Sequence, residues 1–166
     1  MFEQGNYIMY SNYGACLVGE VIEKMIDKEK KMYYILKPIN DTRSKIMTPI
    51  DNTKVKMRAI MTPEEAANVF ALIPNHDATR ILDKKMREQV YSKILKEGDP
   101  NELVEIINAL IIEENEKTVE GKNISATDRK YLERAEKLLY SELSVSLNVK
   151  VEQIKEKVAG MFISLI

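Results

Sequence analysis

The pattern of apolar residues changes near Met61, and this change constrains the fold more than any other feature of the sequence. Before Met61, β-branched and aromatic runs are interrupted by turn residues, which is typical of short strands. After it, apolar residues recur with the period of an α-helix. We therefore predict an α+β protein with two domains, a β domain at residues 1–60 and an α-helical domain at residues 61–166.

Short strand-like runs occupy most of the first part of the chain. They lie at residues 7–10, 15–26, 32–36 and 44–49, with a further short run at 55–57. Gly19, inside the long second run, predicts a bend or bulge. Consecutive antiparallel strands of this size predict a small β-barrel-like sheet with exposed edges. Pro49 lacks a backbone N–H, so we expect it at a strand end or at an edge.

Helix-start signals divide the second part into five helices. Thr62-Pro63-Glu64-Glu65 combines an N-cap, a proline at the first helical position and a capping-box glutamate, and Asp99-Pro100 and Ser125 give related signals. The predicted helices cover about 63–73, 79–97, 100–120, 126–147 and 151–164, which form a compact bundle. In the second helix, Leu82, Met86, Val90 and Ile94 fall on one stripe, which we assign to the core.

The sequence contains no recognisable catalytic constellation. His76 is the only histidine and lies in a polar loop, and the sequence shows neither a metal-spaced Cys/His cluster nor a glycine-rich phosphate loop. We therefore predict a protein that is not an enzyme and that needs no metal or cofactor. Cys16 is the single cysteine, and we expect it in the core. The chain start resembles no signal peptide, and no apolar run is long enough to span a membrane, so we expect a cytoplasmic location without membrane contact.

Charge is unevenly distributed along the chain, although the net charge is only −1. Residues 79–98 carry six basic and three acidic residues, whereas residues 99–120 carry one basic and seven acidic residues. We interpret the acidic run as a solvated helix face. The basic residues near the starts of the second and fourth helices are candidates for phosphate contacts: Arg80, Lys84, Lys85, Arg87, Lys122, Arg129 and Lys130. The alternative is that they are ordinary surface charges paired along the helix, such as Arg129 with Glu133.

Several motifs in this order resemble those of the CarD/CdnL family of bacterial transcription regulators. Tyr10 to Val18 resembles the family's opening Y-P-x-x-G-x-x-x-V, Tyr33-Tyr34-Ile35-Leu36-Lys37 resembles Y-Y-V-L-K, and Ile46 to Ile50 resembles V-M-V-P-V. Lys96 to Pro100 resembles K-S-G-D-P, and residues 125–147 are similar to a long family helix.

This resemblance implies a Tudor-like N-terminal domain that binds the RNA polymerase β subunit and a helical domain that contacts promoter DNA near the upstream edge of the −10 region. Such a protein tunes open-complex stability and takes no small-molecule substrate. Carried onto this sequence, the polymerase contacts fall on Lys24, Lys45, Ile46, Met47, Thr48 and Pro49. The DNA contacts fall near Lys84 to Arg87 and on Arg129 and Lys130.

One departure from the family pattern concerns the DNA contact. Many members carry a wedge tryptophan near the start of the second helix, but this chain has no tryptophan, and ungapped alignment from Gly98 places Lys84 there. We therefore expect a mainly electrostatic DNA contact that is sensitive to salt. The alternative is a protein-only adaptor that does not contact DNA directly.

Overall fold

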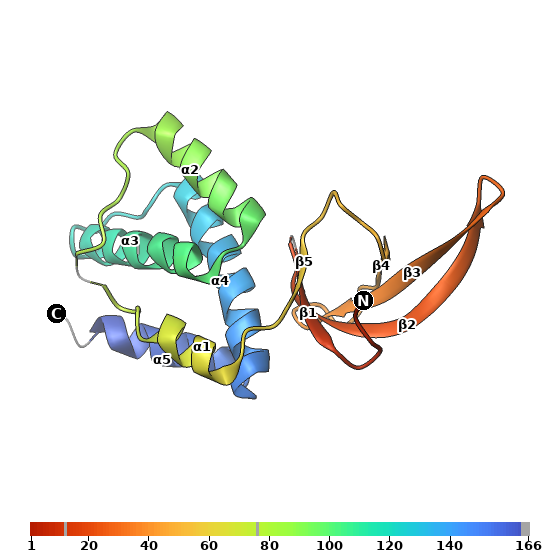
Figure 1. Cartoon of the computed structure of the whole chain (residues 1–166). Helices are drawn as coiled ribbons and strands as arrows, with labels where there is room; N and C mark the ends of the chain where they lie inside the picture. The colour runs from red at the N-terminus through yellow and green to blue at the C-terminus, as the bar shows by residue number, and fades with distance from the viewer. Residues whose placement is uncertain (12, 76, 164–166) are drawn as a thin grey trace. The chain divides into compact units, whose positions relative to one another are not determined.

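The computed structural model describes residues 1–11, 13–75 and 77–163, so the prediction for His76 lies outside the described residues. The chain divides into two compact units, Met1–Ile60 and Met61–Ile166, and each is described by itself (Figure 1). No helix of the described part has the length and apolar character required to cross a membrane.

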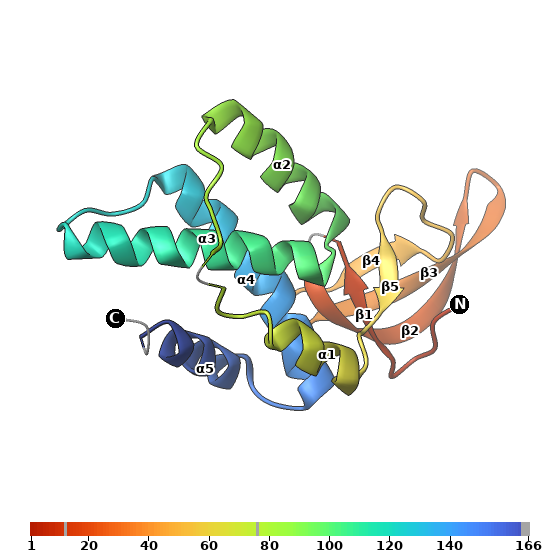
Figure 2. The ribbon, with the colours of Figure 1, turned by 60° about the vertical axis from the view of Figure 1, so that its left-hand side comes forward.

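The first unit is a five-stranded antiparallel sheet. Its strands are β1 (Tyr7–Tyr10), β2 (Gly14–Ile26), β3 (Glu29–Pro38), β4 (Ile46–Pro49) and β5 (Met57–Ala59), in the order β4-β3-β2-β1-β5 (Figure 2). Within the described residues no ladder joins β4 to β5, so the sheet is open and the predicted barrel is not closed. These two edge strands have only four and three residues, which limits the hydrogen bonds available for closure.

β2 and β3 form a long hairpin that extends beyond the ends of the other strands (Figure 1). Its turn residues Asp27 and Lys28 both have positive φ, as a two-residue turn of type I′ requires. The pairing register shifts between Val18 and Val21, which confirms the irregularity predicted at Gly19. A Cβ at Gly19 would lie 3.0 Å from the carbonyl oxygen of Ile35, so the glycine permits close approach of β3.

A small apolar core fills one face of the sheet. Ile8, Tyr10, Cys16, Val18, Tyr34 and Leu36 are its buried members. Cys16 is a buried thiol, which confirms its predicted place in the core.

The described residues of the second unit form five helices, as predicted. They are α1 (Pro63–Phe70), α2 (Lys84–Glu97), α3 (Pro100–Val119), α4 (Ala126–Leu147) and α5 (Val151–Ile163). The capping box at Thr62 is present, because its hydroxyl accepts from the Glu65 N–H and the Glu65 carboxylate accepts from the Thr62 N–H. Asp99 and Ser125 cap α3 and α4 as predicted.

The predicted second helix differs most from the structure. It begins at Lys84 instead of residue 79, because Asp83 has an extended backbone and caps the helix by accepting from the Met86 N–H. The predicted core stripe is wrong for Leu82, Met86 and Val90, which are 80%, 56% and 37% exposed, and is confirmed only for the buried Ile94. Besides Ile94, the buried residues of α2 are Arg87, Tyr91 and Leu95.

Two long-range interactions fix this orientation of α2. Arg87 bonds to the buried Asp128 of α4, and the Tyr91 ring packs edge-on against Tyr131 at a centroid distance of 5.4 Å. Both partners belong to α4, so the spacing of apolar residues within α2 could not predict which face is buried.

The backbone of Met61 is held on both sides by α4. Its N–H donates to Oε2 of the fully buried Glu142 at 2.9 Å, and its carbonyl accepts from the Ser146 hydroxyl at 2.8 Å. The backbone of the first residue of the helical unit is therefore fixed to α4.

Candidate functional site

β4 is an edge strand that pairs with β3 in the described sheet and leaves its other side unpaired there. Residues of a strand point alternately to the two faces of the sheet, and the exposure of β4 follows this rule. Met47 is 44% exposed, whereas Thr48 is 1% exposed. An open edge with an outward apolar side chain suits binding by strand addition.

The six residues predicted to contact the polymerase differ in how exposed their side chains are. Lys45 and Met47 are exposed, and Ile46 and Pro49 are half-buried. Thr48 points inward, because its hydroxyl accepts hydrogen bonds from the Tyr10 hydroxyl at 3.2 Å and from Asn52 Nδ2 at 2.8 Å. Its side chain therefore belongs to the core, and only its backbone can take part in an edge contact.

Lys24 lies on the projecting part of the β2–β3 hairpin. It is exposed and pairs with Lys31 of β3. The pairing of β3 with β4 ends at Tyr33, so Lys31 and Lys24 lie closer to the hairpin tip than any residue paired with β4. The hairpin therefore places a cation past the end of β4.

Arg87, a predicted DNA contact, is buried within the helical unit. Its side chain is 7% exposed, and its Nη1 donates to both carboxylate oxygens of Asp128 at 2.8 Å. Its Nε donates to the carbonyl of Ile81 at 2.8 Å. The arginine therefore holds the start of α2 against α4, and it presents no free donor face to a phosphate.

Arg80 takes part in the same charged network. It forms an ion pair with Glu113 of α3, and its Nη1 lies 3.8 Å from Asp128 Oδ2. Glu113 also pairs with Lys117 at 3.0 Å and is only 7% exposed. The prediction that the acidic residues of α3 are all solvated is therefore wrong for Glu113, which neutralises Arg80 inside the unit.

The remaining candidates are more accessible. Lys84, Lys85 and Lys130 are exposed, and the Lys122 side chain is 71% exposed although it lies 3.7 Å from Glu120. Arg129 forms an ion pair with Glu114 of α3 and keeps a 40% exposed side chain. The structure therefore leaves a basic surface at the start of α2, where Lys84 and Lys85 occupy the first turn.

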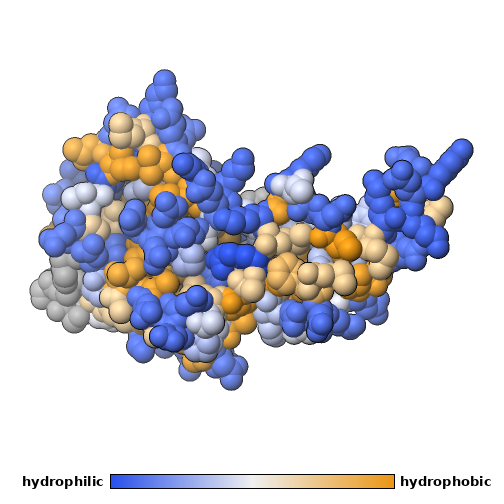
Figure 3. Space-filling model, in the orientation of Figure 1, coloured by the Kyte–Doolittle hydropathy of each residue, from blue (hydrophilic) through white to orange (hydrophobic). Residues whose placement is uncertain are grey.

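Sequence reasoning missed an exposed apolar stripe beside those lysines. Met86 and Val90 lie four residues apart on α2, and Leu82 lies just before its N-cap; all three are exposed, and we call them the α2 stripe. Apolar surface is visible around the start of α2 in Figure 3. The signal that could have revealed the stripe is the competing series Arg87, Tyr91 and Leu95, which also has helical spacing.

The described residues contain no group of three or more His, Cys, Asp or Glu side chains arranged to hold a metal ion. Two surfaces of the structure have features that suit macromolecular contact: an open strand edge in one unit, and a mixed basic and apolar helix start in the other.

Two family models match the chain, one on each unit. Residues 2–61 match the CarD-like/TRCF RID domain, and residues 68–159 match the CarD C-terminal domain. The chain is also 25% identical over 156 residues to YdeB of Bacillus subtilis (strain 168), which is named as a proposed transcription factor. This alignment covers 93% of the chain and 98% of YdeB.

Proposed function

The chain belongs to the CarD family, and from this premise we propose that it regulates transcription by binding the RNA polymerase β subunit and contacting promoter DNA. The first unit, a Tudor-like domain in this proposal, binds the polymerase. The helical unit contacts DNA near the upstream edge of the −10 region and changes the lifetime of the open complex. The open edge of β4 is the observation that carries the proposal.

The polymerase contact is proposed to use strand addition on β4. An unpaired edge offers backbone N–H and C=O groups to a strand of the partner, and side chains at alternate positions supply selectivity. Met47 and Lys45 are the exposed side chains at this edge. Lys24 adds a cation on the hairpin, where it can meet an acidic segment of the partner.

The DNA contact is proposed to combine charge with an apolar surface. Lys84 and Lys85 bind backbone phosphates, and the exposed Lys130 near the start of α4 is a further phosphate contact in this proposal. Leu82 and Met86 supply the apolar contact that a wedge residue makes beside unstacked bases. This proposal adds an apolar part to the mainly electrostatic contact expected from the sequence, because Leu82 is 80% exposed and lies close in sequence to the two lysines.

Two measurements test the proposal together. The full chain should co-purify with core RNA polymerase, and it should change the dissociation rate of a competitor-challenged open complex. If the chain neither binds polymerase nor changes this rate, the proposal is wrong.

A protein-only adaptor is the second candidate function. The observation that favours it is the internal pairing of Arg80, Arg87 and Arg129 with acidic side chains of α3 and α4. Footprinting of the polymerase–promoter complex separates the two functions. A DNA-contacting regulator extends or strengthens protection upstream of the melted region, whereas an adaptor leaves that protection unchanged.

A further inference from the structure

The exposed methionines of the chain lie on the elements that the proposed function uses for contacts. Besides Met1, they are Met25 and Met32 on the β2–β3 hairpin, Met47 on β4 and Met86 on α2. Methionine is common at contact surfaces, because its thioether is flexible, polarisable and apolar. The same thioether is also open to oxidation when solvent reaches it.

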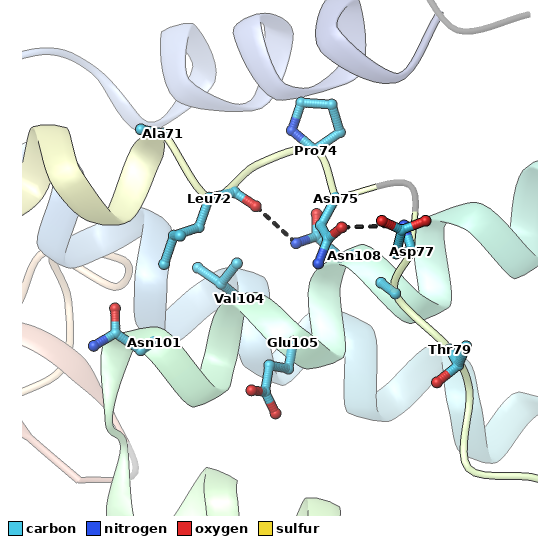
Figure 4. A pocket seen from close by; sticks show the side chains of 11 residues that line it. Ala71, Leu72, Pro74, Asn75, Asp77, Thr79, Asn101, Val104, Glu105 and Asn108 are labelled. Atoms are coloured by element: carbon cyan, nitrogen blue, oxygen red, sulfur yellow. Dashed lines mark hydrogen bonds between the residues drawn. The ribbon is translucent and has the colours of Figure 1, made fainter.

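The other sulfur atoms of the chain are shielded. Met9 and Met61 are only 5% and 7% exposed, and Met57 and Met161 pack against the apolar clusters of their units. Cys16 is completely buried. The described residues that line the hollow between α3 and the segment after α1, shown in Figure 4, include neither methionine nor cysteine. An oxidant therefore reaches sulfur at the contact surfaces before it reaches sulfur in either core.

Met47 is the exposed methionine that lies at the centre of the proposed polymerase contact. It is 44% exposed on the edge strand β4 and pairs with Ile35 of β3, so the two side chains share one face of the sheet. Thr48 beside it points to the core. Strand addition at this edge therefore covers the Met47 thioether together with the half-buried Ile35.

A peroxide converts such a thioether into a sulfoxide. The sulfur attacks one peroxide oxygen, the O–O bond breaks and an S–O bond forms. The sulfur loses two electrons, and the second oxygen leaves as water with both protons. The sulfoxide is polar, and covering a polar group without supplying a donor costs free energy. Oxidised Met47 therefore opposes the contact that reduced Met47 favours.

We propose that Met47 is an oxidation site at which a peroxide weakens polymerase binding, and that thiol-dependent reduction of the sulfoxide restores it. The inference rests on the proposed function, because it assigns a modification to the strand edge which that function uses. The chain then leaves polymerase when peroxide rises and binds again after a methionine sulfoxide reductase has acted.

The test uses the full chain, treated with hydrogen peroxide, cleared of peroxide with catalase and passed over immobilised core polymerase. Peptide mass mapping detects one added oxygen, and it should find the sulfoxide at Met47 before it finds one at Met61. The oxidised chain should bind polymerase about tenfold more weakly or worse. Incubation with methionine sulfoxide reductases and dithiothreitol should restore the original affinity.

Two variants assign the loss to one sulfur atom, and each is compared with itself before and after treatment. Peroxide should not change the affinity of Met47→Leu, because leucine has a similar volume and no sulfur. Met86→Leu removes a methionine that is 56% exposed in the other unit. This variant should lose affinity on oxidation as the original chain does.

Three results would overturn the site. They are the absence of oxidation at Met47 when Met25 and Met86 are oxidised, a Met47 sulfoxide that binds polymerase with unchanged affinity, and an equal loss of affinity in Met47→Leu. Each is obtained with an untreated chain that binds polymerase. An untreated chain that does not bind polymerase contradicts the proposed function itself, and the site fails with it, so the two failures are distinguishable.

Discussion

Nη1 of Arg87 donates to both carboxylate oxygens of Asp128 at 2.8 Å, and this pair ties the start of α2 to α4. Both side chains are almost completely buried. Breaking a buried pair by removing one partner is much more harmful than losing a surface pair, because the other charge remains buried without compensation.

Arg87→Ala should therefore destabilise the helical unit by about 3–5 kcal/mol. Chemical denaturation followed by circular dichroism measures the loss. Lys84→Ala on the same helix is the control and should change stability by less than about 0.5 kcal/mol, because that side chain is exposed. If the Arg87→Ala protein were fully stable but had lost DNA affinity, Arg87 would be a DNA contact, as predicted from the sequence, and not a structural residue.

Met47→Glu should weaken binding to core polymerase by about tenfold or more, since it places a charge on the proposed apolar edge. Surface plasmon resonance with immobilised polymerase measures the affinity. Tyr7→Glu on β1 is a matched control, because Tyr7 is 43% exposed and Met47 is 44% exposed. Equal effects of the two variants would argue against β4 as the contact.

Lys84→Ala/Lys85→Ala should reduce the salt dependence of promoter binding by the polymerase complex. Each lost phosphate contact lowers the slope of log affinity against log salt by about 0.9, so the double variant should lower it by about 2. Lys150→Ala is the control, since Lys150 is exposed but lies between α4 and α5. An unchanged slope would show that these lysines do not contact phosphate.

Leu82→Ser should shorten the open-complex lifetime at least about threefold while leaving stability within about 0.5 kcal/mol. Stability should be unaffected because Leu82 is 80% exposed, and a solvated side chain contributes little to the free energy of unfolding. A competitor-challenge assay measures the lifetime. Val119→Ser, at a residue that is 83% exposed on α3, should leave the lifetime unchanged. If both variants behave like the original chain, the apolar contact with DNA is wrong.

Glu136→Gln should raise the melting temperature at pH 7 by about one or two degrees. Burial raises the pKa of Glu136, and the nearby Glu114 and Glu133 also raise it, against the opposing effect of Lys155 and Arg129. A carboxyl whose folded pKa lies above its unfolded pKa is destabilising once pH exceeds both values, and the effect disappears below the unfolded pKa. The variant and the original chain should therefore melt together near pH 3. An equal difference at both pH values would contradict this explanation.

Local signals predicted much of the fold. The helix starts after Thr62, Asp99 and Ser125 follow from side chains that bond to the next turn, so they can be recognised from neighbouring residues alone. The bulge at Gly19 was likewise visible in the sequence. These features need no knowledge of distant contacts.

Contacts between residues far apart in the sequence determine which side chains of α2 and β4 are buried, and local sequence patterns do not predict them. Arg87 and Asp128 are 41 residues apart, and their pairing places Arg87 inward and leaves Met86 and Val90 of α2 exposed. Thr48 was similarly drawn inward by the Tyr10 hydroxyl, 38 residues away. Charge and apolar spacing indicated a helix and a strand as candidates, but not which of their side chains face solvent.

The anchoring of Met61 to α4 has a consequence for how the two partners are engaged. β5 ends at Ala59 and Met61 is held by Glu142 and Ser146, so Ile60 alone separates the last strand from an anchored residue. A tether this short confines the second binding event to a small volume once the first has occurred. If the chain acts as proposed, docking on polymerase gives α2 a high effective concentration at the promoter, so that even a weak intrinsic DNA affinity is sufficient for occupancy.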